Sequence, residues 1–408
     1  MKKIAIIGGG ASGLFCAIRL LTEQSNANVT IFEKMSRVGK KILATGNGRC
    51  NITNQNADKP EHYHSDNVDF VLPSLNNFSN KDLIKYFEDN AIILRKEDDK
   101  YYPFSEQAGT ILDFLRLKAE FLGAKIVTDT KIEKIQKSNQ NYIINNEKFD
   151  YVVVACGGKS SPHLGSDGSG YKLLRDLSHT TTPLFPAITQ IKTNTEFVKQ
   201  LKGIKADALC KIYVDGDIIR EEFGQVLFAD YGLSGPPIFQ LSLIAAKNYQ
   251  SDCKISLDFM TDMSEDKICD LIHSTISNPY TYPLTLENLL STFLNKRLGQ
   301  VILKYCGYKL NLDAYELTQE DIQSIAKTIK NFELKVNGVN GFQNAQVTAG
   351  GINVNEFNPK TLESKLSKNL YAIGEILDVT GDCGGYNLQW AFSSGSLCAR
   401  SISEDIND

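Results

Sequence analysis

The chain has 408 residues, with 44 lysines and arginines against 48 aspartates and glutamates, which leaves a net charge of −4. This length predicts two or three domains, and the mild negative balance gives no bulk attraction to DNA or to a membrane surface. The nine cysteines are dispersed and no apolar run reaches membrane length, so we expect no disulfide framework, metal site or membrane span, and a cytoplasmic location.

The first stretch predicts a buried strand, a glycine-rich turn and a helix. Ile4–Ile7 is a short apolar run, and the residues after Gly13 carry apolar side chains at helical spacing. Gly8, Gly10 and Gly13 between them have G-x-G-x-x-G spacing. At a strand-to-helix turn this spacing is typical of dinucleotide binding, because the first N–H groups of the helix can bind a pyrophosphate.

An acidic residue ends the next predicted strand. Val29–Phe32 is followed by Glu33, about twenty residues after the last glycine, where a carboxylate can accept both ribose hydroxyls of an adenosine. The same charge repels a 2′-phosphate. The alternative is an ordinary glycine-rich turn with a surface glutamate.

The segment from Lys34 to Asn54 is rich in glycine, in asparagine and in cationic side chains, and it predicts a loop rather than a helix or a strand. Such a loop can wrap a second anionic or polar ring system. A solvated turn is an equally good interpretation.

Helices are predicted at Asn80–Phe87 and Gly109–Ala119, and the aromatic turn between them, Tyr101–Phe104, is expected to pack in the core rather than stack on a ligand. The short strands predicted after them are Lys125–Asp129, Lys131–Ile135, Tyr142–Ile144 and Lys148–Asp150.

A second buried strand, Tyr151–Cys156, ends in Gly157 and Gly158. Backbone without side chains at this point permits a cofactor to lie against it. His163 in the following loop is interpreted as an ordinary loop histidine rather than a catalytic one.

The middle of the chain reads as an insertion. Alternating stretches within 189–258 predict an antiparallel sheet or small barrel, and 259–332 predicts helices. The segment 333–408 again contains buried strands that end in glycine turns, as the segment 1–188 does.

Near the end of the chain, the strand Leu370–Ile373 is followed by Gly374 and, four residues later, Asp378, a position from which a carboxylate can bind a ribityl hydroxyl. The loop Gly381–Gly385 then enters a helix. A glycine loop before a helix points N–H groups at an oxygen that gains negative charge, as one edge of a flavin does on reduction.

Five segments together resemble the HI0933-like (YhiN/BaiN-type) family of three-domain bacterial flavoproteins. They are Gly8–Gly13, Val38–Asn54, Gly157–Ser160, Tyr231–Pro236 and Gly381–Phe392. The resemblance implies an α/β fold, in which a Rossmann-type FAD-binding domain of the glutathione-reductase type (1–188 and 333–408) is split by an inserted β-barrel (189–258) and a helical domain (259–332). Asp230 stands where the family's histidine is expected, so no role is carried over to that position.

The resemblance also implies which residues bind FAD. The pyrophosphate is expected at the Gly8–Gly13 turn, the adenosine ribose at Glu33, the ribityl chain or pyrophosphate at Asp378 and the isoalloxazine edge at Gly384–Leu388. The complete expected set is Gly8, Gly10, Ala11, Ser12, Gly13, Glu33, Lys34, Lys40, Thr45, Gly46, Asn47, Ile132, Ala155, Gly157, Gly374, Asp378, Gly384, Gly385, Tyr386, Asn387 and Leu388.

The resemblance implies an FAD-dependent oxidoreductase with hydride transfer at flavin N5. The implied reaction is the NAD(P)H-linked reduction of a conjugated C=C bond, in a small molecule or in a uridine of large ribosomal RNA. Because one dinucleotide fingerprint is present, NADPH or NADH is expected to visit transiently. A flavin amine oxidase and a non-catalytic FAD-binding module are the alternatives, no DNA or membrane partner is expected, and the oligomeric state is left open.

A reductase of this kind also needs an acid that protonates the neighbouring carbon. Cys50 and Cys383 are the candidates, each with burial in the core as the alternative. Arg49 is the candidate anchor for an anionic or carbonyl substrate, or else it neutralises the reduced flavin.

Overall fold

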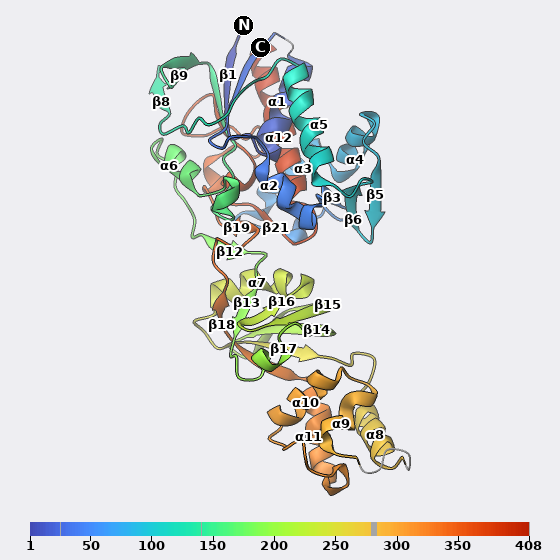
Figure 1. Ribbon diagram of the computed structural model, residues 1–408. Helices are drawn as coiled ribbons and strands as arrows, with labels where there is room; N and C mark the ends of the chain where they lie inside the picture. Colours follow the sequence, from blue (N-terminus) through green and yellow to red (C-terminus); the bar gives the residue numbers. More distant parts are fainter. Residues whose placement is uncertain (25, 140, 279–283, 408) are drawn as a thin grey trace. The chain divides into compact units, whose positions relative to one another are not determined.

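The computed structural model describes residues 1–24, 26–139, 141–278 and 284–407. The chain divides into two compact units, shown in Figure 1. Unit 1 consists of Met1–Pro186 and Phe342–Asp408, and unit 2 is the continuous segment Ala187–Gly341 between them.

A parallel sheet forms the centre of unit 1. Its strands, in spatial order, are β20 (Leu370–Ala372), β11 (Tyr151–Val154), β1 (Lys3–Ile7), β2 (Asn28–Phe32) and β7 (Lys125–Val127). The inner strands are runs of isoleucine and valine, and nearly every residue of β1 and β11 is buried, as expected for a sheet covered on both faces. Strand β20, from the second segment of unit 1, completes the edge beside β11.

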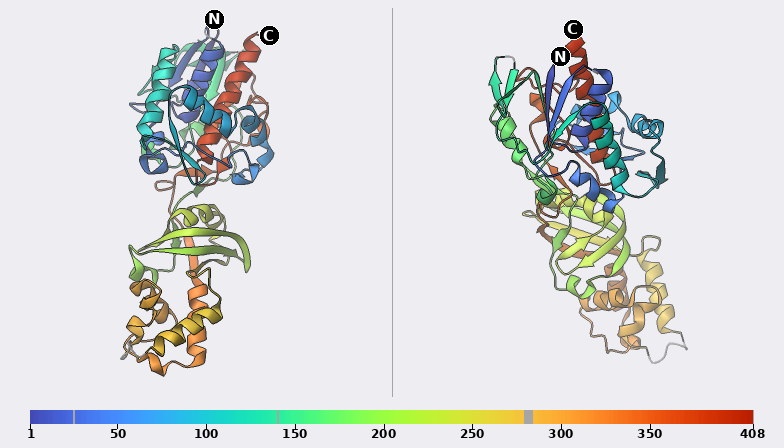
Figure 2. Two further views of the ribbon diagram at one scale, coloured as in Figure 1. Left: turned by 90° about the vertical axis from the view of Figure 1, so that its right-hand side faces the viewer. Right: turned by 45° about the horizontal axis from the view of Figure 1, so that its top comes forward.

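Helix α12 packs along α1, and α5 packs against α1 as well. Glycine permits the first of these contacts, because a Cβ at Gly395 of α12 would lie 2.8 Å from the carbonyl oxygen of Ser12 in α1. The N- and C-termini lie side by side (Figures 1 and 2). The helices of unit 1 are α1 (Ala11–Glu23), α2 (Lys40–Ala44), α3 (Leu72–Asn77), α4 (Asn80–Asp89), α5 (Ala108–Phe121), α6 (Ser169–Arg175) and α12 (Tyr386–Asn407).

Small antiparallel sheets complete this unit. They are β3 (Thr53–Asn54) with β6 (Lys100–Pro103) and β5 (Leu94–Glu97); β8 (Gln136–Ser138) with β9 (Asn141–Ile144) and β10 (Glu147–Phe149); β4 (Tyr63–His64) with β21 (Thr380–Gly381); and β12 (Phe185–Ala187) with β19 (Val347–Ala349). The pairing of β4 with β21 joins the two chain segments of unit 1.

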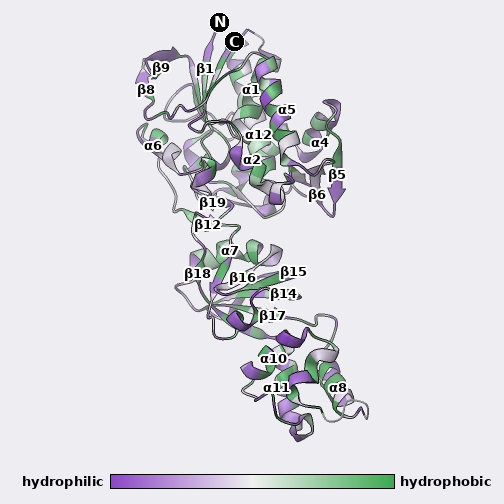
Figure 3. Cartoon of the chain, viewed as in Figure 1, coloured by the Kyte–Doolittle hydropathy of each residue, from purple (hydrophilic) through white to green (hydrophobic). Residues whose placement is uncertain are grey.

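Unit 2 is built on a closed barrel with a helical part. The barrel strands, in spatial order, are β13 (Ile191–Thr193), β16 (Gly232–Ser234), β15 (Asp217–Ala229), β14 (Lys205–Val214), β17 (Cys253–Asp258) and β18 (Phe332–Val339). The helices of unit 2 are α7 (Pro236–Asn248), α8 (Glu265–Ile276), α9 (Leu286–Leu289), α10 (Lys296–Tyr305) and α11 (Gln319–Lys330). In Figure 3, hydrophobic and hydrophilic residues alternate along α8, α10 and α11, as expected for helices with one buried face.

The predicted α/β class, with a split Rossmann-type domain, an inserted barrel and inserted helices, is confirmed. The predicted boundary at residue 333 falls inside β18, which is the last barrel strand, and unit 1 resumes only at Phe342. The strand belongs to the barrel because it pairs with β17 and β13.

Three local predictions were wrong. Lys40–Ala44, predicted as loop, is the helix α2, in which Ile42 is buried and which packs on α5. Tyr101–Phe104, predicted as a turn, contributes Tyr101–Pro103 to strand β6, which pairs with β5. Lys131–Ile135 forms no strand.

Within the described residues, no helix combines the length and the apolar character needed to cross a membrane. The segment 279–283, inside the predicted helical insertion, lies outside the described residues.

Candidate functional site

The glycine turn between β1 and α1 has the geometry of an anion site. Gly8 has φ +115°, and a Cβ there would lie 2.3 Å from the carbonyl oxygen of Ala155. A Cβ on Gly13 would lie 2.1 Å from the Gly8 oxygen, whereas one on Gly10 would meet no atom within 4 Å. Gly8 and Gly13 therefore close the turn against β11, and Gly10 leaves open space before the helix. Because no side chain caps α1, its first N–H groups can bind a ligand.

Glu33 lies at the carboxyl end of β2 and holds the turn in place. Its carboxylate accepts the N–H of Gly9 at 2.9 Å and the N–H of Met35 at 2.8 Å. The backbone of the same residue accepts the N–H of Thr130 at 2.9 Å, so the extended segment that contains Ile132 follows directly beside it. Glu33 thus combines a positioning role with lone pairs that can accept ribose hydroxyls.

The second chain segment of unit 1 reaches the same turn. A Cβ on Gly374, which has φ +72°, would lie 2.7 Å from the Ser12 hydroxyl, and the Gly374 carbonyl accepts the indole N–H of Trp390 at 3.0 Å. Ala155 donates its N–H to Ile7 at 2.8 Å. The structure therefore gathers the predicted residues after β1, β11 and β20 at one edge of the sheet, where a ligand of an open α/β sheet binds.

Two lysines at this edge are already paired. Lys34 lies 2.5 Å from Asp167, and Lys41 lies 2.7 Å from Glu375. Sequence reasoning did not select Lys41 or Glu375, although Glu375 also accepts the N–H of Thr348 at 2.9 Å. Glu375 could have been found from its position in the sequence, because it directly follows Gly374 after the strand β20. Lys40 is half-buried at the start of α2.

The loop after α2 meets the C-terminal glycine loop. Gly46 and Asn47 both have left-handed backbone, with φ +56° and +55°, and Thr45 caps the end of α2 by donating its hydroxyl to Ile42 at 2.7 Å. At the other end of this loop, a Cβ on Gly385 would lie 2.5 Å from the Thr53 backbone. The bare backbone of Gly385 is what lets the two chain segments come together there.

Beside this contact, Asn51 has a buried amide oxygen that finds no hydrogen-bond partner among the described residues. The oxygen would lie 2.9 Å from a Cβ on Gly385. A buried acceptor that is left unpaired costs stability, so it points to a donor from a ligand or from water.

The three predicted catalytic residues have different environments. Arg49 forms an ion pair with Glu97 at 2.8 Å and lies over the ring of Tyr102 at 4.3 Å. Cys50 is fully buried, and this burial raises the pKa of its thiol to about 12, which favours the packing alternative for Cys50. Cys383 is half-buried in the loop that follows β21.

Residues of the C-terminal loop hold one another in place. The Asn387 amide donates to the Gly381 carbonyl and accepts from the Gly381 N–H, both at 2.8 Å, so it shapes the loop from within. Asp378 is buried and accepts the N–H of Asp66 at 3.3 Å. Tyr386 is buried and Leu388 is half-buried at the start of α12.

Two histidines lie beside this loop that sequence reasoning did not select. His62 Nδ1 lies 3.3 Å and His64 Nε2 2.8 Å from the carboxylate of the buried Asp382. His62 ends the 3-10 turn Pro60–His62, and His64 follows two residues later in the short strand β4. The distance of more than 300 residues along the chain to Asp382 hid the cluster from local motifs.

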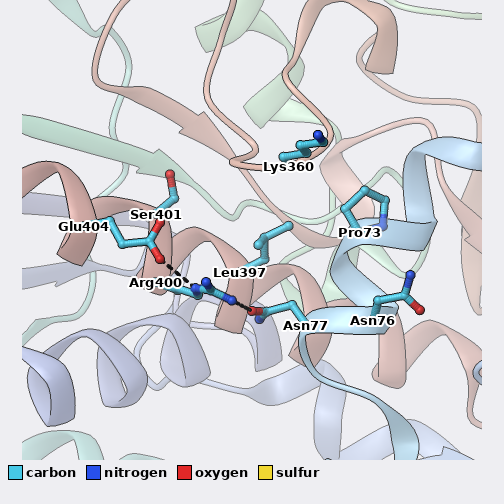
Figure 4. Close-up of a pocket in the computed structure, with 8 residues that line it drawn as sticks. All are labelled: Pro73, Asn76, Asn77, Lys360, Leu397, Arg400, Ser401 and Glu404. Atoms are coloured by element: carbon cyan, nitrogen blue, oxygen red, sulfur yellow. Dashed lines mark hydrogen bonds and ion pairs between the residues drawn. The ribbon is translucent and has the colours of Figure 1, made fainter.

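A separate hollow of about 320 Å³ lies between α3 and α12, lined by Pro73, Asn76, Asn77, Lys360, Leu397, Arg400, Ser401 and Glu404 (Figure 4). None of these residues belongs to the predicted site. Arg400 spans the hollow by bonding Glu404 at 2.7 Å and Asn77 at 3.2 Å.

The residues present fit an FAD molecule. The open space at Gly10, the uncapped start of α1 and the lone pairs of Glu33 suit the adenosine and pyrophosphate. The Asn51 oxygen, unpaired within the described part of the chain, supplies an acceptor beside Gly385 in the C-terminal glycine loop.

Comparisons with known proteins agree with this geometry. The family model described as "HI0933-like protein Rossmann domain" matches residues 2–401. The chain is 36% identical, over 99% of its length and 100% of the relative's, to the 3-dehydro-bile acid delta(4,6)-reductase of Clostridium scindens. It is 30% identical to the ribosomal RNA dihydrouridine synthase of Haemophilus influenzae, with 98% of each chain covered.

Among solved structures, the chain is similar to 3-ketosteroid delta1-dehydrogenase from Sterolibacterium denitrificans, with 12% identity, a TM-score of 0.49 and coverage of 99% of this chain and 100% of that one. The match to the family model over nearly the whole chain, and the full-length relatives, decide the family. The chain belongs to the HI0933-like family and is an FAD-dependent oxidoreductase.

Proposed function

We propose that this protein is an NAD(P)H-linked reductase that saturates a C=C bond conjugated with a carbonyl group in a small molecule. The observation that carries the proposal is the nature of the two full-length relatives. One is named as a delta(4,6)-reductase of a 3-dehydro bile acid and the other as a synthase of dihydrouridine in ribosomal RNA. Both names describe removal of a C=C bond from a carbonyl-containing ring.

The site residues suit this chemistry. The bound FAD supplies a hydride in its reduced form. The turn at Gly8–Gly13 and Glu33 bind the adenosine end, and Gly384–Leu388 with Asp378 border the other end. The first N–H groups of α12, which begins at Tyr386, would stabilise a flavin oxygen that gains negative charge on reduction.

Arg49 and Cys383 remain candidates for substrate contact in this proposal. Arg49 is held over Tyr102 and against Glu97, and this pair raises the pKa of the guanidinium still further, so it stays cationic at every working pH. A fixed cation of this kind can orient a substrate carboxylate or carbonyl.

The two relatives act on different substrates, and the chain is not equally similar to them. The identity of 36% to the bile acid reductase exceeds the 30% to the ribosomal RNA enzyme. We therefore place a small conjugated ketone before a uridine of ribosomal RNA as the substrate class.

Anaerobic half-reactions test the proposal. The purified yellow protein is expected to bleach with NADPH or NADH and to regain its colour with a conjugated cyclic enone. Recovery of colour only with ribosomal RNA that lacks dihydrouridine would move the substrate to RNA. Bleaching by small amines, but by neither nicotinamide, would show an amine oxidase, and a bound flavin that no donor reduces would show a non-catalytic module; either result contradicts the proposal.

A further inference from the structure

The cluster of His62, His64 and Asp382 is the feature of unit 1 that the proposed function leaves without a role. Asp382 is 6% exposed, so its carboxylate is buried and its pairing with two imidazoles satisfies it. The histidine side chains themselves are 27% and 35% exposed and so reach solvent. A buried carboxylate between two accessible imidazoles is an arrangement that can hold and move a proton.

The cluster is tied to the C-terminal glycine loop. The N–H of Asp382 donates to the carbonyl of His62 at 2.9 Å, and Asp382 stands two residues before Gly384. The His62 ring lies against the Tyr386 ring, with 4.6 Å between centroids. Tyr386 in turn abuts the loop, since its Cε2 would lie 3.7 Å from a Cβ on Gly384.

The order of contacts gives the cluster a direction. Asp382 itself lies in the glycine loop, and His62 faces it with Nδ1 while its ring lies against Tyr386 at the end of that loop. His64 lies in β4, opposite Thr380, and is the more exposed imidazole of the two. The contacts therefore run from the exposed His64 through Asp382 to His62 and on to Tyr386.

We propose that His62 supplies the proton that saturation of a C=C bond requires, and that Asp382 and His64 orient His62 and restore its proton. This inference rests on the proposed function. Saturation adds a hydride, which carries both electrons, to one carbon and a proton to its neighbour. The N–H bond of the His62 imidazolium breaks as the new C–H bond forms, its electron pair stays on nitrogen, and water replaces the proton through His64.

In this assignment the proton donor, His62, has access to solvent, whereas the thiol of Cys50 is buried. The groups that set the protonation of the pair belong to its own segment and to the elements packed on it. They are Glu61 and Tyr63 beside the histidines, Asp69 of the 3-10 turn Val68–Val71, Asp382 and Cys383 after β21, and Tyr386 of α12.

The test uses the FAD-loaded full chain with the substitutions His62→Gln, His64→Gln and Asp382→Asn, and with His163→Gln as control, because His163 is an exposed histidine outside the cluster. Each protein is reduced anaerobically and then reoxidised by 2-cyclohexen-1-one or by a 4-en-3-one steroid across pH 5–9. Ferricyanide serves as a second acceptor that takes electrons without protonation of carbon.

We expect His62→Gln to slow reoxidation by the enone about 100-fold and to flatten its pH profile, in the range of general acid catalysis. Asp382→Asn and His64→Gln should each slow it about tenfold and shift the profile. Reoxidation by ferricyanide, the FAD content and the flavin spectrum should stay within twofold of the parent protein in all variants.

A second readout is independent of turnover. In the flavin-free protein, the imidazole NMR signals of His62 and His64 should both shift in Asp382→Asn at a fixed pH, because both rings contact that carboxylate, with those of His163 unchanged.

Two results would overturn the inference: enone reoxidation in His62→Gln that keeps the parent rate and pH profile, or imidazole NMR signals of His62 and His64 that do not change in Asp382→Asn. A parent protein that no conjugated acceptor reoxidises would instead contradict the proposed function.

Discussion

At the scale of single residues, Glu33 shows how one carboxylate can both shape a turn and bind a ligand. Its two oxygens hold the N–H groups of Gly9 and Met35, and each keeps a lone pair that can accept a ribose hydroxyl. Replacing the carboxylate removes a charged acceptor, and hydrogen bonds to charged groups contribute about 1.5–3 kcal/mol each.

We predict that Glu33→Gln weakens FAD binding by about 10- to 100-fold, which a fluorescence titration of the flavin-free protein measures. Glu23→Gln is the matched control, because Glu23 pairs with Arg19 on the exposed face of α1. Equal affinity of the two variants would show that Glu33 does not contact the adenosine.

Gly13 provides a second prediction at this scale. A Cβ on Gly13 would come 2.1 Å from the Gly8 oxygen, so Gly13→Ala forces the turn apart. We expect the free energy of unfolding to fall by about 3 kcal/mol and the affinity for FAD to decrease. Gly109→Ala, in the first turn of α5 where a Cβ meets nothing within 4 Å, should be neutral or up to about 1 kcal/mol stabilising in urea titrations.

At the scale of elements, a buried histidine helps to hold the connection between α6 and β12 to the C-terminal segment. His179 lies 2.8 Å from Glu356 and 2.9 Å from Ser364, and its ring stacks on Phe357. Burial lowers the pKa of His179 from its usual 6.5, and the pKa of Glu356 is lowered as well, since hydrogen bonds from Thr180 and His179 outweigh its burial.

Both shifts destabilise the protein in acid. The unfolded chain binds more protons than the folded one below the ordinary histidine pKa, so stability falls as the pH drops from about 6.5, and Glu356 adds a further loss below its own unfolded value. We predict that His179→Gln flattens this dependence between pH 7 and pH 5 in thermal unfolding. His273→Gln, a substitution of an exposed histidine on α8, should leave it unchanged.

The sequence was sufficient for the elements whose signals are local. The apolar runs of β1 and β11 and the glycine spacing at Gly8–Gly13 predicted the central sheet and its turn. Helix α2 was missed because the glycines on either side of Lys40–Ala44 indicate a loop. The segment is helical because Ile42 is buried and the helix packs on α5. The His62–Asp382 cluster and the Lys41–Glu375 pair were missed because each joins residues more than 300 positions apart.

At the scale of the whole molecule, the buried hydrophobic residues that the structure describes form two clusters, one in each unit. Unit 2 is one continuous segment with its own closed barrel, and its core does not depend on unit 1. Unit 1 instead needs both chain segments, because β20 pairs with β11 and α12 packs along α1.

We predict that residues 187–341 expressed alone unfold in one cooperative transition, and that residues 1–186 alone do not fold. Truncation of the second segment removes Trp390 and Phe392, which are both 1% exposed, from the core. Circular dichroism with urea titration measures both outcomes. A cooperative transition in the 1–186 fragment would contradict the account of unit 1.

The central claim is that the residues gathered from both segments of unit 1 at one sheet edge hold a single FAD. The most direct test extracts and quantifies the flavin of the purified full-length protein, after saturation with FAD and removal of the excess. The account predicts one equivalent of FAD per chain, and a protein that retains no flavin, or retains FMN in its place, would contradict it.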